Sequence, residues 1–184
     1  MSGLRIGHAP ESVPVCMKFL RRYRFVLCTA LLLLAAGALW YATRPFLFGQ
    51  TKDGIFFAER AEPGMPVVME YMHSAMRTPI VETLYVDENA RGFILKSLRY
   101  RTFGAGLPYS AEEGHFRQED GWFIMDDMNR RFPDISIRNG VINNGTLTVG
   151  RTAYHLPELM PLGTELHLYI APLYEGYWKQ KDIH

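Results

Sequence analysis

Cysteine is nearly absent from this chain, and the little there is lies close to one end. Only two cysteines occur among 184 residues, Cys16 and Cys28. The long polar part of the sequence therefore offers no disulfide and no thiolate metal site of its own. A stretch of that length buries enough apolar surface to fold without covalent cross-links. Cysteine usage consequently says nothing about the compartment in which the protein works.

Charge is missing altogether from residues 25–42, which read FVLCTALLLLAAGALWYA. As a helix rising 1.5 Å per residue, this stretch is about 27 Å long, close to the ~30 Å hydrocarbon core of a bilayer. Trp40 and Tyr41 stand at its far end, where amphipathic rings favour the headgroup layer. The sequence therefore predicts a single transmembrane anchor over residues 25–42.

Basic residues gather on the near side of this anchor. Five Lys and Arg precede residue 25 against one acid, whereas residues 45–184 carry 14 basic and 18 acidic residues. The positive-inside bias predicts a cytoplasmic tail over residues 1–24 and a periplasmic or extracellular remainder, held on a bacterial inner membrane. Because that remainder is mildly acidic, it is a poor binder of phosphate, and we expect no nucleic-acid partner.

Other interpretations of this segment stay open. Ala36-Gly37-Ala38 resembles a signal-peptidase site, although the apolar run continues beyond Ala38. Cys28 follows the bulky Leu27, which disfavours a lipoprotein signal. Met17 begins MKFLRRYRF and is a second candidate for the true start of the protein.

The rest of the chain divides into a linker, a β domain and a tail. Residues 43–65 are rich in Pro and Gly and predict a linker, in which 55–57 adds a strand or lies against the bilayer. Residues 66–173 alternate short apolar runs with turn residues, which predicts an all-β fold, either an antiparallel β-sandwich or a partly open barrel. Residues 174–184 form a C-terminal tail without a clear assignment.

Within the β domain, period-2 alternation locates the individual strands. A type I′ hairpin turn is expected at Asn139-Gly140, and helix only in small pieces such as 125–131. The expected strands cover residues 66–73, 80–86, 93–103, 122–125, 134–138, 146–149, 152–156 and 166–170.

The junction of the first two strands places four reactive groups within ten residues. They are the imidazole of His73, the hydroxyl of Ser74, the guanidinium of Arg77 and the carboxylate of Glu82. If the strands form a hairpin, His73 and Glu82 face each other, and such a pair can act as a general base. The favoured alternative is structural, with Glu82 paired to Arg77 or His73 in a buried turn. Because no activated nucleophile or G-x-S-x-G elbow accompanies them, we predict no catalytic set.

A second notable stretch is the glycine loop, FGAGLP at residues 103–108. It predicts either a tight connection or a contact surface for a partner protein, because its glycines permit positive φ and close backbone approach. It lacks the third glycine and the helix of a dinucleotide site. The acidic pairs and histidines elsewhere do not have ligand spacing, so we expect no metal or cofactor.

Taken in order, these motifs resemble a bacterial family known only as domain of unknown function 1850. The resemblance covers roughly residues 65–171 and is carried by Glu70-x-x-His73-Ser74, Thr78-Pro79-x-x-Glu82, the glycine loop, Gly121-Trp122 and the Leu-Thr-Val run at 147–149. Members of that family are small proteins with an N-terminal anchor or signal. They are commonly encoded beside TAXI-type TRAP transporters, which import organic acids with an extracytoplasmic binding protein.

The resemblance implies an accessory role in solute uptake, through contact with a TRAP-type permease subunit or its extracytoplasmic binding protein. The alternative is an independent binding module for a small carboxylate, contacted by Arg77 and the glycine loop. A small hydrolase using His73, Ser74 and Glu82 is the least favoured hypothesis. The expected signature or interaction residues are His73, Ser74, Arg77, Thr78, Pro79, Glu82, Phe103, Gly104, Gly106, Leu107 and Pro108.

Overall fold

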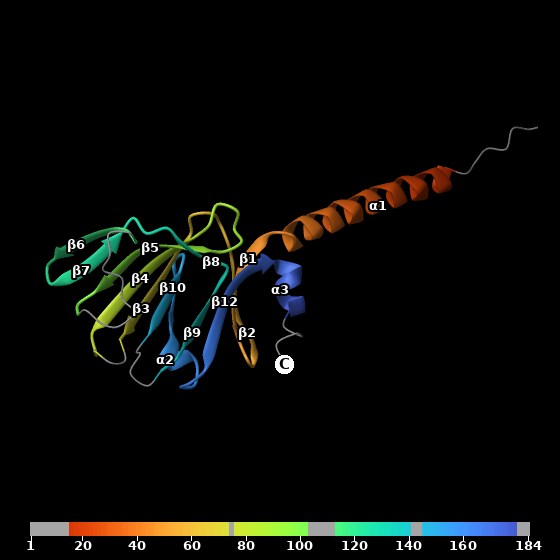
Figure 1. Ribbon diagram of the computed structural model, residues 1–184. Coiled ribbons are helices and arrows are strands. Elements are labelled where there is room, and N and C mark those ends of the chain that lie inside the picture. The colour runs from red at the N-terminus through yellow and green to blue at the C-terminus, as the bar shows by residue number, and fades with distance from the viewer. Residues whose placement is uncertain (1–14, 74–75, 103–112, 141–144, 180–184) are drawn as a thin grey trace, which may run out of the picture. The chain divides into compact units, whose positions relative to one another are not determined.

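The computed structural model describes residues 15–73, 76–102, 113–140 and 145–179 (Figure 1). The chain forms two compact units, Met1–Tyr41 and Ala42–His184. The first is dominated by helix α1 (Val15–Ala42), and the second is a β domain built mostly of antiparallel strands. This division confirms the expected apolar helix ahead of an all-β domain.

The Tyr23–Ala42 part of helix α1 is apolar and exposed on every side. This segment is long and apolar enough to cross a membrane, and none of it is buried. Leu32, Leu33 and Leu34 point in different directions around the helix, yet each is about 70% exposed, at 71%, 69% and 71%. A core helix of a soluble protein would bury such side chains against its own fold. The segment is therefore compatible with a membrane anchor, while its orientation stays a prediction.

The β domain consists of two antiparallel sheets, which we call the small sheet and the large sheet. The small sheet has the order β2-β1-β12-β9, and the large sheet the order β11-β10-β3-β4-β5-β7-β6, with β8 paired to β5. The strands are β1 (Pro45–Thr51), β2 (Gly54–Arg60), β3 (Pro66–Met72), β4 (Pro79–Val86), β5 (Phe93–Tyr100), β6 (His115–Glu119), β7 (Trp122–Asp126), β8 (Arg130–Phe132), β9 (Asp134–Arg138), β10 (Thr146–Val149), β11 (Thr152–His155) and β12 (Glu165–Pro172). Two short helices follow strands, α2 (Leu156–Leu159) and α3 (Leu173–Lys179).

The two sheets share one hydrophobic core, as in a β-sandwich. Leu47 and Leu168 of the small sheet and Val67 and Leu147 of the large sheet are completely buried in the same cluster. Each occupies an inward position of its strand, so that the alternation seen in the sequence becomes the inner face of a layer. The fold class predicted from the sequence is thus confirmed.

The segment at 43–65 forms two strands, and the prediction of a linker there was wrong. Strand β1 pairs with β12 on one side and β2 on the other. Pro45 stands at the first position of its strand, where its missing N–H is tolerated. Gly49 lies where the β1–β2 register shifts, and a Cβ there would clash with the ring of Phe57. The missing side chain of Gly49 therefore allows the Phe57 ring to pack closely at a β-bulge. The strand expected at 55–57 is confirmed as part of β2.

Three smaller expectations also need correction. Residues 125–131 are not helical, because β7 ends at Asp126 and β8 begins at Arg130. Strand β5 ends at Tyr100, before the expected residue 103, which lies outside the described residues. The tail at 174–184 contributes helix α3, which packs on β1 and β12.

Asn139 does not form the expected hairpin turn. Strand β9 pairs with β12 in the small sheet, whereas β10 pairs with β3 and β11 in the large sheet. The Asn139 backbone N–H donates to the carbonyl of Thr164 at 2.9 Å, beyond the end of the β9–β12 ladder. Its side chain is 1% exposed, and its Nδ2 donates to the carbonyl of Met160 at 2.8 Å. Asn139 thus joins the loop after α2 to the small sheet.

Replacing Asn139 should destabilise the domain. We expect Asn139→Ala to lower the free energy of unfolding by about 1–3 kcal/mol, because it leaves a buried carbonyl without its donor. Asn139→Asp should cost more, since a carboxylate would then face that carbonyl in a buried site. Thermal unfolding of the two variants in detergent measures both effects. Equal melting temperatures for both variants and the unaltered protein would contradict this role.

Candidate functional site

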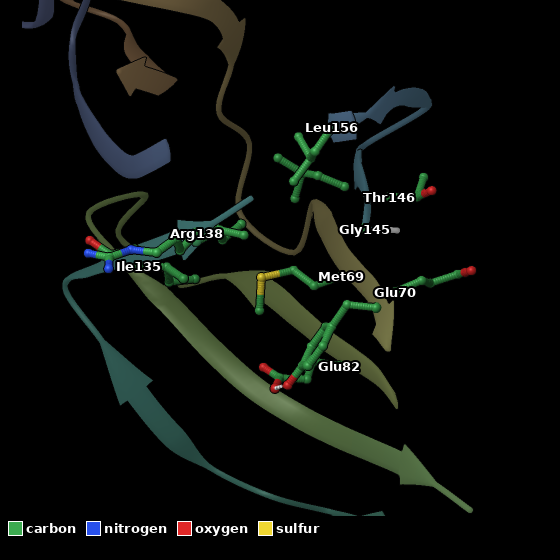
Figure 2. A pocket seen from close by; sticks show the side chains of 12 residues that line it. Met69, Glu70, Glu82, Ile135, Arg138, Gly145, Thr146 and Leu156 are labelled. Carbon is green, nitrogen blue, oxygen red and sulfur yellow. Dashed lines mark hydrogen bonds between the residues drawn. The ribbon is translucent and has the colours of Figure 1, made fainter. Parts of the chain in front are cut away.

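A pocket of about 270 Å³ lies between β9 of the small sheet and the strands β3, β4 and β10 of the large sheet (Figure 2). Its apolar lining comes from Met69, Ile135, Ile137, Leu147 and Leu156. Figure 2 shows Met69, Ile135 and Leu156 around a common space, whereas the side chains of Glu70 and Thr146 point away from it. The volume is slightly below the range typical of pockets for drug-sized molecules, so it suits a small ligand.

The polar end of this pocket is built on Glu82 of β4. Its neighbours two residues away on the same strand, Ile80 and Leu84, are each 1% exposed and belong to the core. Glu82 therefore occupies a position where the alternation of the strand calls for an apolar side chain. The backbone register places it opposite Met69 on β3.

Tyr71 is the hydrogen-bonding partner of this carboxylate. Its hydroxyl donates to Glu82 Oε1 at 2.6 Å. Tyr71 lies two residues beyond Met69 on β3 and so projects from the same face of the sheet. Burial raises the pKa of Glu82 above its ordinary value, an effect that the Tyr71 hydrogen bond and the charge of Arg130 partly oppose. Burial and the adjacent carboxylate raise the pKa of Tyr71, so the phenol keeps its proton and remains the donor.

The raised pKa of Glu82 makes a testable contribution to stability. A group whose pKa is raised on folding stabilises the protein fully below its ordinary pKa, here 4.5, and loses that contribution as the pH rises through the folded-state pKa. Glu82→Gln removes this titration while keeping an acceptor for Tyr71. Relative to the unaltered protein, the variant should therefore gain thermal stability as the pH rises above 4.5.

The matched control for this experiment is Glu70→Gln. Glu70 lies on the same pair of strands, but its side chain is exposed and points away from the pocket. We expect it to change the pH dependence much less than Glu82→Gln. Melting temperatures of Glu82→Gln and of the unaltered protein that differ by the same amount over the whole pH range would contradict a carboxylate whose pKa is raised by burial.

Arg138 of β9 lies beside the pocket and is the one basic residue among the described residues that line it. Its guanidinium points outward, because the inward positions of β9 are Ile135 and Ile137. Its side chain is 72% exposed and forms an ion pair with Glu165 of β12, with an N–O distance of 3.3 Å. An exposed pair of this kind contributes little to stability, so the guanidinium can exchange its partner at small cost.

His73 and Glu82 do not face each other, and this predicted pair was wrong. The His73 N–H donates to the Thr78 carbonyl at 2.9 Å, which closes the hairpin at these two residues. Glu82 is four residues past Thr78 and therefore pairs with residue 69, four residues before His73. The structural alternative, a pair of Glu82 with Arg77 or His73, is replaced by the bond to Tyr71.

The other predicted site residues lie around this hairpin or outside the described residues. Arg77 is exposed at the turn, where it adopts a left-handed φ of 50°, and Pro79 begins β4 opposite Met72. His73 Nδ1 accepts from the Met76 N–H at 3.3 Å within the same turn. Among the predicted residues that the structure describes, only Glu82 lines the pocket. Ser74, Phe103, Gly104, Gly106, Leu107 and Pro108 lie outside the described residues.

Sequence reasoning missed the partners of Glu82. Tyr71 and Met69 lie on the neighbouring strand, and Ile135 and Arg138 come from β9, far along the chain. One signal was available, because Ile80-x-Glu82-x-Leu84 puts a carboxylate in the apolar phase of a strand. Charges at such positions mark sites where the fold gives up stability for another purpose. Among the described residues, no group of three or more His, Cys, Asp or Glu side chains is arranged to hold a metal ion.

The comparisons with known proteins bear on the β domain alone. The model of a family described as "Domain of unknown function (DUF1850)" matches residues 67–156, from β3 to the first residue of α2. No curated protein and no solved structure matches the chain. The match confirms the resemblance to this family, whereas the association with TAXI-type TRAP transporters stays a prediction. Residues 67–156 of this chain, which contain Tyr71 and Glu82, are thus similar to the DUF1850 family model.

Proposed function

We propose that this protein is a membrane-anchored accessory protein that acts by protein–protein contact outside the membrane. The observation that carries the proposal is the exposed apolar segment Tyr23–Ala42, separated from the first strand of the β domain by only Thr43 and Arg44. A domain joined so closely to an anchor works at the membrane. The five basic residues before the anchor favour a cytoplasmic N-terminus and a β domain on the periplasmic or extracellular side of a bacterial inner membrane.

The resemblance to the DUF1850 family suggests the partner. It is a TRAP-type permease subunit of the TAXI kind or the extracytoplasmic binding protein that serves it, in the uptake of organic solutes. Confinement to the same membrane raises the effective concentration of the two proteins, so a weak contact suffices. Such a contact lets the accessory protein leave and rejoin the transporter during its cycle.

Co-purification tests this proposal. The full chain, tagged at its C-terminus, is co-expressed with a TAXI-type permease and its binding protein, solubilised in mild detergent and recovered on the tag. We expect the permease or the binding protein in the eluate. The control is the same tag on residues 1–44, which retain α1 but not the β domain and should recover neither. Equal recovery with both baits, or with neither, contradicts a contact made by the β domain.

The pocket favours a second candidate function, the binding of a small organic acid. Met69, Ile135 and Leu156 would surround an apolar tail. Arg138 would meet the carboxylate after its guanidinium leaves Glu165 and turns toward the pocket. This assignment differs from the expectation of a site at Arg77, which is exposed at the β3–β4 turn and does not line the pocket. Tyr71 and Glu82 would offer a hydrogen bond to a hydroxyl or amino group on the same ligand.

Thermal shift of the full chain with a panel of short-chain and medium-chain carboxylic acids tests this second function. We expect one subset of the panel to raise the melting temperature, and Met69→Trp to abolish that rise by filling the pocket. Met72→Trp is the matched control, because Met72 lies on the same strand but not in the pocket lining. A flat response across the panel, or an equal loss in both variants, contradicts binding at this site.

A further inference from the structure

Helix α3 packs on the small sheet, against a second apolar cluster that lies outside the main core. That cluster contains Phe46, Phe48, Tyr169 and Ala171, with Leu173 packed against it. Gly176 is buried over Phe48, and a Cβ there would clash with the Phe48 ring. The Tyr169 hydroxyl lies 3.3 Å from the Gly176 carbonyl oxygen. The orientation of α3 is therefore set by the sheet beneath it.

The exposed part of α3 carries three aromatic side chains, of which Tyr177 also meets the Phe48 ring at 6.0 Å between centroids. Tyr174, Tyr177 and Trp178 are 58%, 55% and 71% exposed. Their spacing of three and four residues places them on one side of the helix, and we call this surface the aromatic face. Exposed Trp and Tyr gathered in one place mark a contact surface, because their rings remove much apolar area from water while their polar ends stay hydrated.

The aromatic face lies beside the point where the chain enters the β domain from α1. The N–H of Leu173, the first residue of α3, donates to the carbonyl of Arg44 at 3.1 Å. Arg44 is only two residues beyond Ala42, the last residue of the apolar segment. The register of β1 and β12 pairs Pro45 with Pro172 at the same edge. Figure 1 shows α3 next to the start of β1, and β7 at the other end of the β domain.

We propose that the aromatic face of Tyr174, Tyr177 and Trp178 inserts into the headgroup layer of the bilayer that holds α1. The inference rests on the proposed membrane anchor. If Tyr23–Ala42 spans the membrane, residue 42 stands at the membrane–water boundary, and Arg44 with its bonded partner Leu173 lies within a few ångströms of that level. Trp and Tyr are the residues that favour this layer. The face gives the domain a second attachment, which restricts its rotation about the anchor.

Quenching of tryptophan fluorescence by brominated lipid tests the proposal. Two variants of the full chain are reconstituted in phosphatidylcholine vesicles, with and without bromine near the headgroup end of the acyl chains. Trp40→Phe retains Trp122 and Trp178, and the double variant Trp40→Phe/Trp178→Phe retains Trp122 alone. Trp122 lies on β7, with Arg101 over its ring at 4.7 Å, and serves as the distant reference.

We expect brominated lipid to remove a larger fraction of the emission from Trp40→Phe than from the double variant, because only Trp178 reaches the lipid. Gly176→Leu, whose side chain would clash with the Phe48 ring and disturb the packing of α3, should reduce that excess. Equal fractional quenching in the first two variants overturns the inference. Failure of the anchor is recognised separately, since the protein would then leave the vesicles without detergent. A protein that stays with the vesicles but shows no excess quenching disproves the aromatic contact alone.

Discussion

Phe48→Ala is expected to lower the free energy of unfolding by about 3–5 kcal/mol, the usual cost of truncating a buried phenylalanine. The Phe48 side chain is completely buried on the outer side of the small sheet. Its ring stacks on Tyr169 with centroids 5.3 Å apart and meets the edge of Tyr177 at 6.0 Å. Truncation to alanine therefore leaves a cavity between β1, β12 and α3. Chemical denaturation of the full chain in detergent measures the loss.

The control for Phe48 is Tyr85→Ala on β4. Tyr85 is also an aromatic residue of a strand, but it is 37% exposed, so its truncation should cost at most about 1 kcal/mol. Similar losses for the two variants would contradict the structure and would favour a linker over residues 43–65. The expected difference has a practical consequence. A fragment limited to residues 67–156, the part that matches the family model, lacks β1, β2 and β12 and should not fold.

The second large effect concerns the anchor. Leu33→Arg combined with Leu34→Arg should shift the protein out of the membrane, because each arginine at the centre of a span costs about 3 kcal/mol. Leu33 and Leu34 lie at the middle of residues 25–42 and are both exposed on α1. Together the two changes disfavour insertion by about 6 kcal/mol, a factor of more than ten thousand. Alkaline extraction of membranes, followed by detection of the protein in pellet and supernatant, measures the shift.

Leu33→Ala with Leu34→Ala is the matched control, since it shortens the same two side chains without adding charge. We expect that variant and the unaltered chain in the membrane pellet. Unaltered protein extracted without detergent would rule out the anchor. The mass of the purified protein tests the remaining alternative, a cleaved signal peptide. Cleavage after Ala38 would remove residues 1–38 and leave a chain that begins at Leu39.

The alternation of apolar and polar residues predicted the strands that have one buried and one exposed face. It missed strands whose two faces are alike. Strands β4, which contains IVETLYV, and β12 show the period of two, and both were located from the sequence. Strand β1 is buried on both faces, by the core on one side and the α3 cluster on the other, so its residues show no alternation. Strand β6 was missed for the opposite reason, because most of its side chains are exposed at the edge of the large sheet.

The site was only half predictable for a different physical reason. Glu82 could be chosen as a site residue because it is a carboxylate near a turn, but its partner depends on the hairpin register. The hairpin closes at His73 and Thr78, and this register places Glu82 opposite Met69 and within reach of Tyr71. Spacing along the chain alone does not reveal it. The opposite wall of the pocket comes from β9, which belongs to the other sheet. Neither relationship is present in a local pattern of residues.

The central place of β12 in the small sheet also governs the order in which the protein is built. β12 lies between β1 and β9, although β1 is the first strand to be synthesised and β12 the last. During translation, β1 therefore keeps one unpaired edge until nearly the whole domain has been synthesised. Contacts between such distant parts of a chain form slowly, and exposed strand edges invite pairing with other chains. Premature termination before residue 165 would leave β1 and β9 without their shared neighbour β12 in the small sheet.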